Sequence, residues 1–346
     1  MSAGRTTSPG RRRSTGLFTP AKIKGLALYA INARAAARPE LGGVERWTRE
    51  LSARLPYRVV KPPQALSHRA GHAWEQAVLP VLTARALALL CPANLAPLVA
   101  RNVVVVIHDA APLRHPAWYS GTYAAVQLRL LPLVARRARR VITVSEFSKR
   151  ELAELLGVDA EVVPGGVDPR FAPQESRRDR PYVLTVASHT ARKNLSALVP
   201  AAQALAREGV DLLVAGGHRP QFAAEANLTG LTLLGHVPDD ELPGLYAGAE
   251  AFVLPSVYEG FGLPVLEAMA SGTPVVATDT TALPETCGGA ARLVAPEAEA
   301  LRDALTQLLG DADERARLRA LGLERVREFT WERTAREVDA IVRSSR

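Results

Sequence analysis

Residues 251–278, AFVLPSVYEGFGLPVLEAMASGTPVVAT, decide the fold of this chain. The apolar start of the stretch, Ala251 to Pro255, indicates a buried strand, and the glycines beyond it indicate a loop. Pro264 is placed to be the first residue of a helix, and Gly272 is the expected end signal. Pro274 to Ala277 predicts the next strand. Strand, loop, helix and strand in this order are the repeating unit of a parallel sheet with helices on its faces.

Two glutamates lie eight residues apart in this stretch. Glu259 falls in the loop beyond the carboxyl end of the predicted strand, and Glu267 falls inside the predicted helix. Between them, the backbone N–H groups of Phe261 to Leu263 point out of a helix N-terminus, which suits an anion. A loop carboxylate, exposed amides and a helix carboxylate could together hold a sugar, its phosphate and a ribose. The alternative is an ordinary α/β turn with a solvated helix glutamate.

Strands and helices are expected to alternate over the whole chain in two series. The first series begins with the strand Ile23 to Ile31 and includes the apolar run Val103 to Ile107, which is typical of a doubly covered parallel strand. The second begins with the strand Tyr182 to Ala187, and the best candidate linker between them is Pro164 to Gly166. We therefore predict two Rossmann-like α/β domains. Ligands bind beyond the carboxyl ends of parallel strands, so the active site should lie in the cleft between the domains.

The composition is ordinary for a globular protein of two domains. The chain has 346 residues, of which 47% are apolar and 23% charged. Its two cysteines, Cys91 and Cys287, lie far apart without a partner motif, which argues against a disulfide framework or a zinc site and fits a reducing cytoplasm. No secretory signal is expected. The apolar region Ala77 to Ala100 is interrupted by Arg85 and by prolines, so we expect buried protein there rather than a membrane span.

Positive charge is concentrated in the first half of the chain. Residues 1–170 contain 25 Lys and Arg against 11 Asp and Glu, whereas the remainder contains 18 against 24. Arg136 to Arg140 follow the apolar segment Leu128 to Val134, and together they could attract an anionic membrane surface or a phosphate-bearing acceptor. A solvated basic helix face is the alternative. Nucleic acid is a weaker option, because aromatic residues make up only 5% of the chain and no recognition motif accompanies the arginines.

Further polar residues follow two of the predicted strands. His108 and Asp109 come directly after the valine-rich strand, where Asp109 could orient the histidine ring or cap the following turn. Arg192 and Lys193 follow the first strand of the second series, with Asn194 as the expected N-cap of the next helix. Each group should therefore face the cleft. A structural histidine and a solvated basic pair are the alternatives.

The string from Phe252 to Thr278 resembles the donor-site signature of the retaining glycosyltransferases of family four, also called group 1, which have the GT-B fold. The resemblance covers roughly residues 22–346 and is weakest in residues 52–100. Gly165 stands where the family commonly has asparagine, a departure that affects the linker more than the chemistry.

The resemblance implies a division of the chain. Residues 22–165 would form the N-terminal acceptor-binding domain and residues 166–330 the C-terminal nucleotide-sugar domain. The last helix, in residues 331–346, would cross back onto the first domain. Residues 1–21 are expected to be a disordered basic tail, because they are rich in Ser, Thr, Gly and Pro. Closure of the two domains would complete the site.

The resemblance also implies a role for each candidate residue. His108 and Glu259 would contact the transferred sugar and are the candidate catalytic residues. Arg192 and Lys193 would neutralise the donor diphosphate, the arginine as a fork and the lysine as a point charge. The other donor-binding candidates are the glycine loop, the position that frames the base, the helix start and the ribose carboxylate: Gly42, Gly43, Val237, Gly260, Phe261, Gly262, Leu263 and Glu267.

The implied reaction moves a hexose, with retention, from a nucleotide diphosphate sugar to a hydroxyl of a lipid-linked or polysaccharide-precursor glycan. GDP-mannose is the first choice of donor, ahead of UDP-glucose and UDP-N-acetylglucosamine. A non-catalytic nucleotide-sugar-binding protein and an epimerase of the same fold are the alternatives. Because no residue is a convincing nucleophile, we favour a front-face mechanism.

No metal or other cofactor is expected. The Asp-x-Asp string from Asp311 to Asp313 lies between two C-terminal helices and indicates a helix cap. Arginine, lysine and a helix dipole would meet the phosphate charge instead. We expect the protein in the cytoplasm, with peripheral contact to the inner membrane face as an option and no nucleic acid partner.

Overall fold

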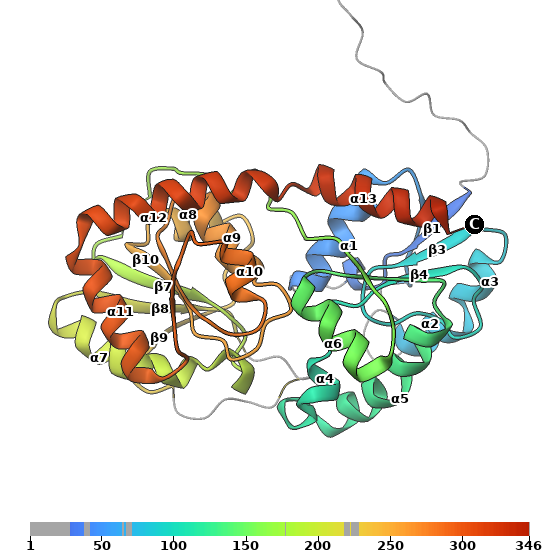
Figure 1. The fold of residues 1–346 in the computed structure, drawn as a ribbon, viewed down its shortest axis with the longest axis horizontal. Coiled ribbons are helices and arrows are strands. Elements are labelled where there is room, and N and C mark those ends of the chain that lie inside the picture. Colours follow the sequence, from blue (N-terminus) through green and yellow to red (C-terminus); the bar gives the residue numbers. More distant parts are fainter. Residues whose placement is uncertain are drawn as a thin grey trace, which may run out of the picture.

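The computed structural model describes residues 28–37, 42–63, 66, 71–176, 178–217, 222 and 228–345. In this part of the chain, two six-stranded parallel sheets form two lobes that lie side by side (Figure 1). The first sheet, in the order β2-β1-β3-β4-β5-β6, consists of β1 (Tyr29–Asn32), β2 (Arg58–Val60), β3 (Ala88–Cys91), β4 (Val103–Val106), β5 (Arg140–Thr143) and β6 (Glu161–Val162). The second, in the order β12-β11-β10-β7-β8-β9, consists of β7 (Tyr182–Val186), β8 (Asp211–Ala215), β9 (Thr232–Gly235), β10 (Ala251–Leu254), β11 (Val275–Thr278) and β12 (Arg292–Val294).

Helices connect the strands and cover the sheets. Those of the first half are α1 (Gly43–Arg54), α2 (Gly71–Ala77), α3 (Leu79–Thr83), α4 (Ala111–Arg114), α5 (Gly121–Arg137) and α6 (Glu146–Leu156). The later ones are α7 (Val199–Arg207), α8 (Leu242–Ala247), α9 (Leu263–Ala270), α10 (Leu283–Cys287), α11 (Ala298–Gly310), α12 (Ala312–Arg325) and α13 (Trp331–Ser344). Short 3-10 helices are η1 (Ala35–Ala37), η3 (Pro116–Trp118), η4 (Ala191–Lys193), η5 (Leu195–Leu198) and η6 (Val326–Glu328).

Strand β4 shows why its sequence is apolar without a break. Val103 and Val105 belong to a core that includes residues of α5 and α6, while Val104 and Val106 belong to a core that includes residues of α1 and α13. Side chains alternate between the faces of a sheet, so a strand covered on both faces must be apolar throughout. The predicted doubly covered strand, and with it the predicted parallel α/β fold, is confirmed.

The decisive stretch folds almost as its pattern predicts. All four residues of β10 are buried, and β11 follows α9 as expected. Helix α9 begins at Leu263, so the prediction that Pro264 is its first residue is wrong by one position. Gly262 is the N-cap with a φ of +94°, and Gly272, just beyond the helix, has a φ of +74°. Glycine at both ends supplies left-handed turns that other residues rarely adopt.

The last helix lies on the first half of the molecule. In Figure 1, α12 and α13 run across the top from one lobe to the other. Trp331 of α13 stands edge-on to Trp47 of α1, with the ring centroids 5.7 Å apart. Val338 and Val342 belong to the same core as Ile31 of β1. The chain therefore passes between the two halves twice.

Two local predictions are correct in position but differ from the structure in detail. The helix predicted from Leu195 to Arg207 is divided into η5 and α7, because Pro200 falls in the first turn of α7 and has no N–H to continue an earlier helix. Asn194 occupies the predicted N-cap position, that of η5, but its side chain makes no capping hydrogen bond. It has a left-handed backbone, and its Nδ2 donates to the carbonyl oxygens of Pro255 at 3.1 Å and Pro296 at 2.9 Å.

The first hundred residues match the predictions least. Strand β1 begins at Tyr29, and the part of the predicted strand before residue 28, like the predicted basic tail 1–21, lies outside the described residues. The apolar region Ala77 to Ala100 contains α3, β3 and loops. The prediction of buried protein holds for Leu79, Leu89 and Leu90 but is wrong for Val81 and Val99, which are each 74% exposed. In the described ranges, no helix is both long and apolar enough to cross a membrane.

Candidate active site

A cavity of about 570 Å³ lies between the carboxyl ends of the two sheets. That volume is typical of a small-molecule site. Residues of both halves line the cavity. All the site residues predicted from the sequence are among them: Gly42, Gly43, His108, Arg192, Lys193, Val237, Glu259, Gly260, Phe261, Gly262, Leu263 and Glu267. The fold thus gathers candidates from five separate segments around one space.

Glu259 is held by charged and polar groups in the loop after β10. Lys193 donates a hydrogen bond to its Oε1, and the Ser256 hydroxyl donates another at 2.8 Å. Burial raises the pKa of this carboxyl, but the cations of Lys193 and Arg192 outweigh it and hold the pKa of Glu259 below its usual value. The carboxylate is therefore ionised and oriented. Its Oε2 lies 3.9 Å from Nη1 of Arg192, on the cavity wall.

Arg192 has hydrogen-bond donors that the described part of the chain does not use. Its Nε and Nη1 are buried and have no hydrogen-bond partner among the residues that the structure describes. Nη1 lies 3.8 Å from Oδ2 of Asp109 and 3.9 Å from Oε2 of Glu259. Burial lowers the pKa of Arg192, but these carboxylates raise it by more, so the group is a cation. A buried, incompletely paired guanidinium beside a cavity is suited to bind an anion there.

His108 is fixed by its surroundings as a neutral ring. Its Nε2 lies 2.9 Å from the carbonyl oxygen of Pro92, and its ring meets the edge of Trp47 with centroids 5.4 Å apart. Burial lowers the pKa of His108. Because a carbonyl can only accept, Nε2 carries the hydrogen and Nδ1 is the acceptor. Of the two roles considered for Asp109, the turn cap is confirmed, since its Oδ1 accepts from the N–H of Ala111 at 3.1 Å.

The two halves touch at Gly260. Its carbonyl oxygen accepts hydrogen bonds from the hydroxyls of Ser145 at 2.7 Å and Ser148 at 3.1 Å, both from the first half. A Cβ at position 260 would lie 2.4 Å from the carbonyl oxygen of His108. The absence of a side chain therefore permits the contact that brings His108 beside the Glu259 loop.

The glycine loop opens α1 at the edge of the cavity. Gly42 is the N-cap, and its N–H donates to Oε2 of Glu45 at 3.0 Å. A Cβ at Gly43 would meet nothing within 4 Å. Packing inside the protein thus does not explain the missing side chain at Gly43. Space for a ligand beside the start of the helix would explain it.

Glu267 lies deeper, in α9, and is 4% exposed. The Tyr246 hydroxyl donates to its Oε2 at 3.0 Å, and Nε of Arg46 lies 3.5 Å from its Oε1. Burial raises the pKa of Glu267, and Arg46 offsets this only in part. The two glutamates therefore differ: the pKa of Glu259 lies below the usual value and that of Glu267 above it.

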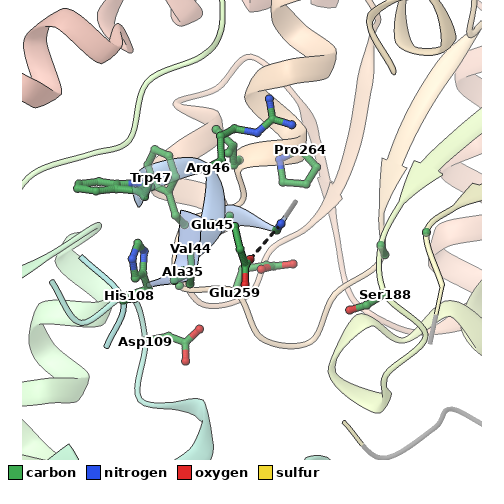
Figure 2. Close-up of a pocket in the computed structure, with 18 of the residues that line it drawn as sticks. Ala35, Val44, Glu45, Arg46, Trp47, His108, Asp109, Ser188, Glu259 and Pro264 are labelled. Carbon is green, nitrogen blue, oxygen red and sulfur yellow. Dashed lines mark hydrogen bonds between the residues drawn. The ribbon is translucent and has the colours of Figure 1, made fainter. Parts of the chain in front are cut away.

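Arg46 and Asp239 are site residues that the sequence analysis missed. Nη2 of Arg46 lies 2.7 Å from Oδ1 of Asp239, and Arg170 binds the other oxygen of Asp239 at 2.7 Å. Figure 2 shows Arg46 and Trp47 projecting from α1, Trp47 toward His108 and Arg46 toward Pro264 at the start of α9. The one sequence signal for Arg46 is its place in the first turn of the helix that follows the glycine loop.

The Asp-x-Asp string lies away from this cavity. Asp311 is the N-cap of α12, and its side chain accepts from the N–H of Glu314 at 2.9 Å, so the predicted helix cap is confirmed. Among the described residues, no three His, Cys, Asp or Glu side chains form a group that could hold a metal ion.

Each half of the chain matches a known protein family. Residues 180–311 match the family described as "Glycosyl transferases group 1", and residues 81–171 match the one described as "Glycosyltransferase Family 4". The first match covers the Glu259 loop, α9 and the basic pair. The second covers His108.

Several curated proteins are similar in sequence. The O-antigen chain mannosyltransferase B of Escherichia coli is 31% identical over 256 residues, which cover 67% of each chain. The MMP alpha-(1->4)-mannosyltransferase of Mycolicibacterium hassiacum is 35% identical over 240 residues, 65% of this chain and 57% of that protein. The alignments thus span 57% to 67% of these relatives' own length.

Solved structures share the whole fold. Sucrose-phosphate synthase from Thermosynechococcus elongatus superposes with a TM-score of 0.69 at 21% identity, covering 91% of this chain and 98% of that one. HepE of Anabaena, in complex with UDP and glucose, superposes with a TM-score of 0.70 at 16% identity, covering 92% and 100%. The predicted GT-B fold is confirmed.

Proposed function

The chain belongs to the group 1 glycosyltransferase family, and we propose that its reaction is the retaining transfer of a hexose. The hexose, with mannose the first choice, would come from a nucleotide diphosphate sugar and pass to a hydroxyl of a lipid-linked or polysaccharide-precursor glycan. One observation carries the proposal. An ionised Glu259, a buried and incompletely paired Arg192 and a neutral His108 face one cavity.

The second half binds the donor in this proposal. Arg192 and Lys193 neutralise the diphosphate, together with the backbone N–H groups of Gly260 to Leu263 at the start of α9. Glu267 accepts hydrogen bonds from the ribose hydroxyls, and the backbone of Val237 frames the base. These groups already supply positive charge at the phosphates, so the scheme uses no metal ion.

The configuration at the anomeric carbon is retained because the acceptor attacks from the face of the sugar that the phosphate leaves. The bond from the anomeric carbon to the phosphate oxygen breaks, and a bond to the acceptor oxygen forms. The acceptor proton moves to the leaving phosphate oxygen. Glu259 and Nδ1 of His108 accept hydrogen bonds from sugar hydroxyls and position the ring. Lys193 and Ser256 hold Oε1 of Glu259, which leaves Oε2 to accept from the sugar, and the proposal gives Glu259 this positioning role.

Mannose is the first choice because the relatives quoted above are mannosyltransferases by name. UDP-glucose and UDP-N-acetylglucosamine are the alternative donors. HepE, which has the same fold, was solved in complex with UDP and glucose. The first-half wall of the cavity includes the basic side chains of Arg34, Arg49 and His72. That wall suits an acceptor that carries phosphate.

The outer face of α5 supports a peripheral membrane contact. Leu128 and Leu133 are 44% and 43% exposed, and the exposed Arg136 and Arg137 follow in the last turn. In Figure 1, α5 lies at the outer edge of its lobe. Apolar and basic side chains on one exposed helix suit an anionic lipid surface. We propose that this face contacts the cytoplasmic side of a membrane.

The test of the proposed activity is a thermal-shift screen across GDP, UDP, ADP and TDP sugars, followed by assay of nucleotide diphosphate release. A ligand that binds only the folded state raises the melting temperature. We expect one nucleotide series to stabilise the protein, and its sugar to be consumed with release of the nucleotide diphosphate. Stabilisation by none of them would contradict the proposal, and binding without release would favour the non-catalytic alternative.

A further inference from the structure

Arg46, which the proposed reaction leaves unused, bridges the two halves beside Glu267. It projects from α1 of the first half and reaches two carboxylates of the second. Its Nη2 lies 2.7 Å from Oδ1 of Asp239, and its Nε lies 3.5 Å from Oε1 of Glu267. The side chain is directed toward α9, the helix that carries Glu267 (Figure 2).

Few groups face the Glu267 carboxylate. Tyr246 of α8 donates to Oε2, while Asp239 in the loop after β9 and Asp168 in the segment between β6 and β7 add negative charge. Arg46 supplies the positive charge. Because both Arg46 and Glu267 are buried, solvent does little to screen their interaction.

The protonation state of Glu267 decides what it can bind. A ribose offers two neighbouring hydroxyl donors, and an ionised carboxylate can accept from both. A protonated carboxyl has lost part of this acceptor capacity and presents a donor instead. Burial favours the protonated form, and a nearby cation favours the ionised form.

We propose that Arg46 is a positioning residue for donor binding, which acts through Glu267 by keeping that carboxylate ionised and in place. The inference rests on the proposed role of Glu267 as the ribose ligand. Asp239 anchors the guanidinium by its stronger contact, and Arg170 in turn holds Asp239 from the other side. Donor affinity is thereby linked to contact between the two halves, because Arg46 and Glu267 belong to different lobes.

The experiment measures binding of GDP and of UDP by calorimetry, as a function of pH, in the full chain. Arg46→Met keeps the apolar stem and removes the charge. The acid limb is the pH range in which affinity falls because Glu267 becomes protonated. We expect this acid limb to lie about one pH unit higher in Arg46→Met, because a cation at this distance lowers the pKa of a carboxyl by at least one unit. Affinity should fall about ten-fold below the limb and approach that of the parent at alkaline pH. Arg46→Lys, which keeps the charge, should restore most of the profile.

Asp239→Asn is the matched control, because it removes the ion pair between the halves, while the amide oxygen can still accept from Arg46 and keep it beside Glu267. Asp239 raises the pKa of Glu267, so its loss should leave the acid limb in place or move it to lower pH. If Arg46 served only to hold the halves together, Arg46→Met and Asp239→Asn would weaken binding alike at every pH. That result would overturn the inference.

Glu267→Gln separates this inference from the proposed function. We expect it to bind nucleotide weakly and without an acid limb, so that it resembles the parent at acid pH and falls below the parent as pH rises. A Glu267→Gln protein that binds nucleotide like the parent at every pH would contradict the ribose assignment itself. If Glu267→Gln binds nucleotide weakly but the acid limb of Arg46→Met lies at the same pH as that of the parent, only the role of Arg46 would be overturned.

Discussion

The Ser145 hydroxyl of the first half donates a 2.7 Å hydrogen bond to the carbonyl oxygen of Gly260 in the second half. Ser145 is also the N-cap of α6, so one side chain both starts a helix and joins the halves. Gly260 follows Glu259 directly. The contact between the halves is therefore built into the loop that carries Glu259, the carboxylate proposed to bind the sugar.

Gly260→Ala should reduce activity with little effect on folding of each half. The new Cβ would lie 2.4 Å from the carbonyl oxygen of His108, so the halves must separate or the loop must move. We expect kcat/KM to fall about 100-fold, since displacement of reacting groups by about 1 Å costs that much. Gly310→Ala, at the end of α11 where a Cβ meets nothing within 4 Å, should behave like the parent. Equal rates for Gly260→Ala and Gly310→Ala would show that this contact is dispensable.

Arg192→Met should separate function from stability. Two buried nitrogens of Arg192 have no hydrogen-bond partner among the described residues, so removing them should not lower the urea midpoint of the donor-free protein. Nucleotide affinity should fall about 10- to 100-fold, as expected for the loss of hydrogen bonds to a charged group. A lower midpoint with unchanged affinity would indicate that Arg192 is structural.

The two glutamates should respond to pH in opposite ways. The pKa of Glu259 is lowered in the folded state, so its stabilising contribution is present above the unfolded pKa of about 4.3 and is lost as pH falls through the lower folded pKa. Relative to the parent, Glu259→Gln should therefore lose most stability near neutral pH and least in acid. Urea midpoints over this range provide the measurement.

Glu267→Gln should show the reverse trend. The pKa of Glu267 is raised by burial, so the folded state binds more protons than the unfolded state above about pH 4.3. Its ionisation costs stability as pH rises through the raised folded pKa. Glu267→Gln should thus gain on the parent toward neutral pH. Parallel trends for the two variants would mean that their environments do not differ as described.

Charge reversal on α5 tests the membrane contact. Arg136→Glu with Arg137→Glu should reduce binding to phosphatidylglycerol vesicles, because each basic side chain near an anionic surface contributes about 1 kcal/mol. Binding to phosphatidylcholine vesicles should be weak for parent and variant. Arg302→Glu, on α11 of the other half, is the control and should sediment with vesicles like the parent. If all three proteins sediment alike, α5 is not the contact.

Local patterns predicted the elements that depend on neighbours in sequence. Strand β10, the turn at Gly262 and helix α9 follow from apolar runs, glycine and proline within one stretch, so their place and much of the cavity wall could be predicted. His108 and the basic pair could be placed because parallel strands bring their carboxyl ends to one edge.

Contacts between distant segments could not be predicted in this way. Arg46 meets Asp239 across 193 positions, and nothing in either segment marks the other. The partner of the His108 ring is a backbone carbonyl, that of Pro92, which no side-chain pattern reveals. Asn194 lies at a helix N-cap as predicted, but its side chain donates to two loop carbonyl groups instead of accepting from the helix.

The central claim is retaining transfer, and the anomer formed during slow hydrolysis of the donor tests it most directly. Water then takes the place of the acceptor, and proton NMR at early times distinguishes the two anomers before they interconvert. From GDP-mannose, or from the nucleotide sugar selected by the thermal-shift screen, we predict that the anomer present in the donor appears first, which is the α-anomer for GDP-α-mannose. First appearance of the opposite anomer would contradict retention.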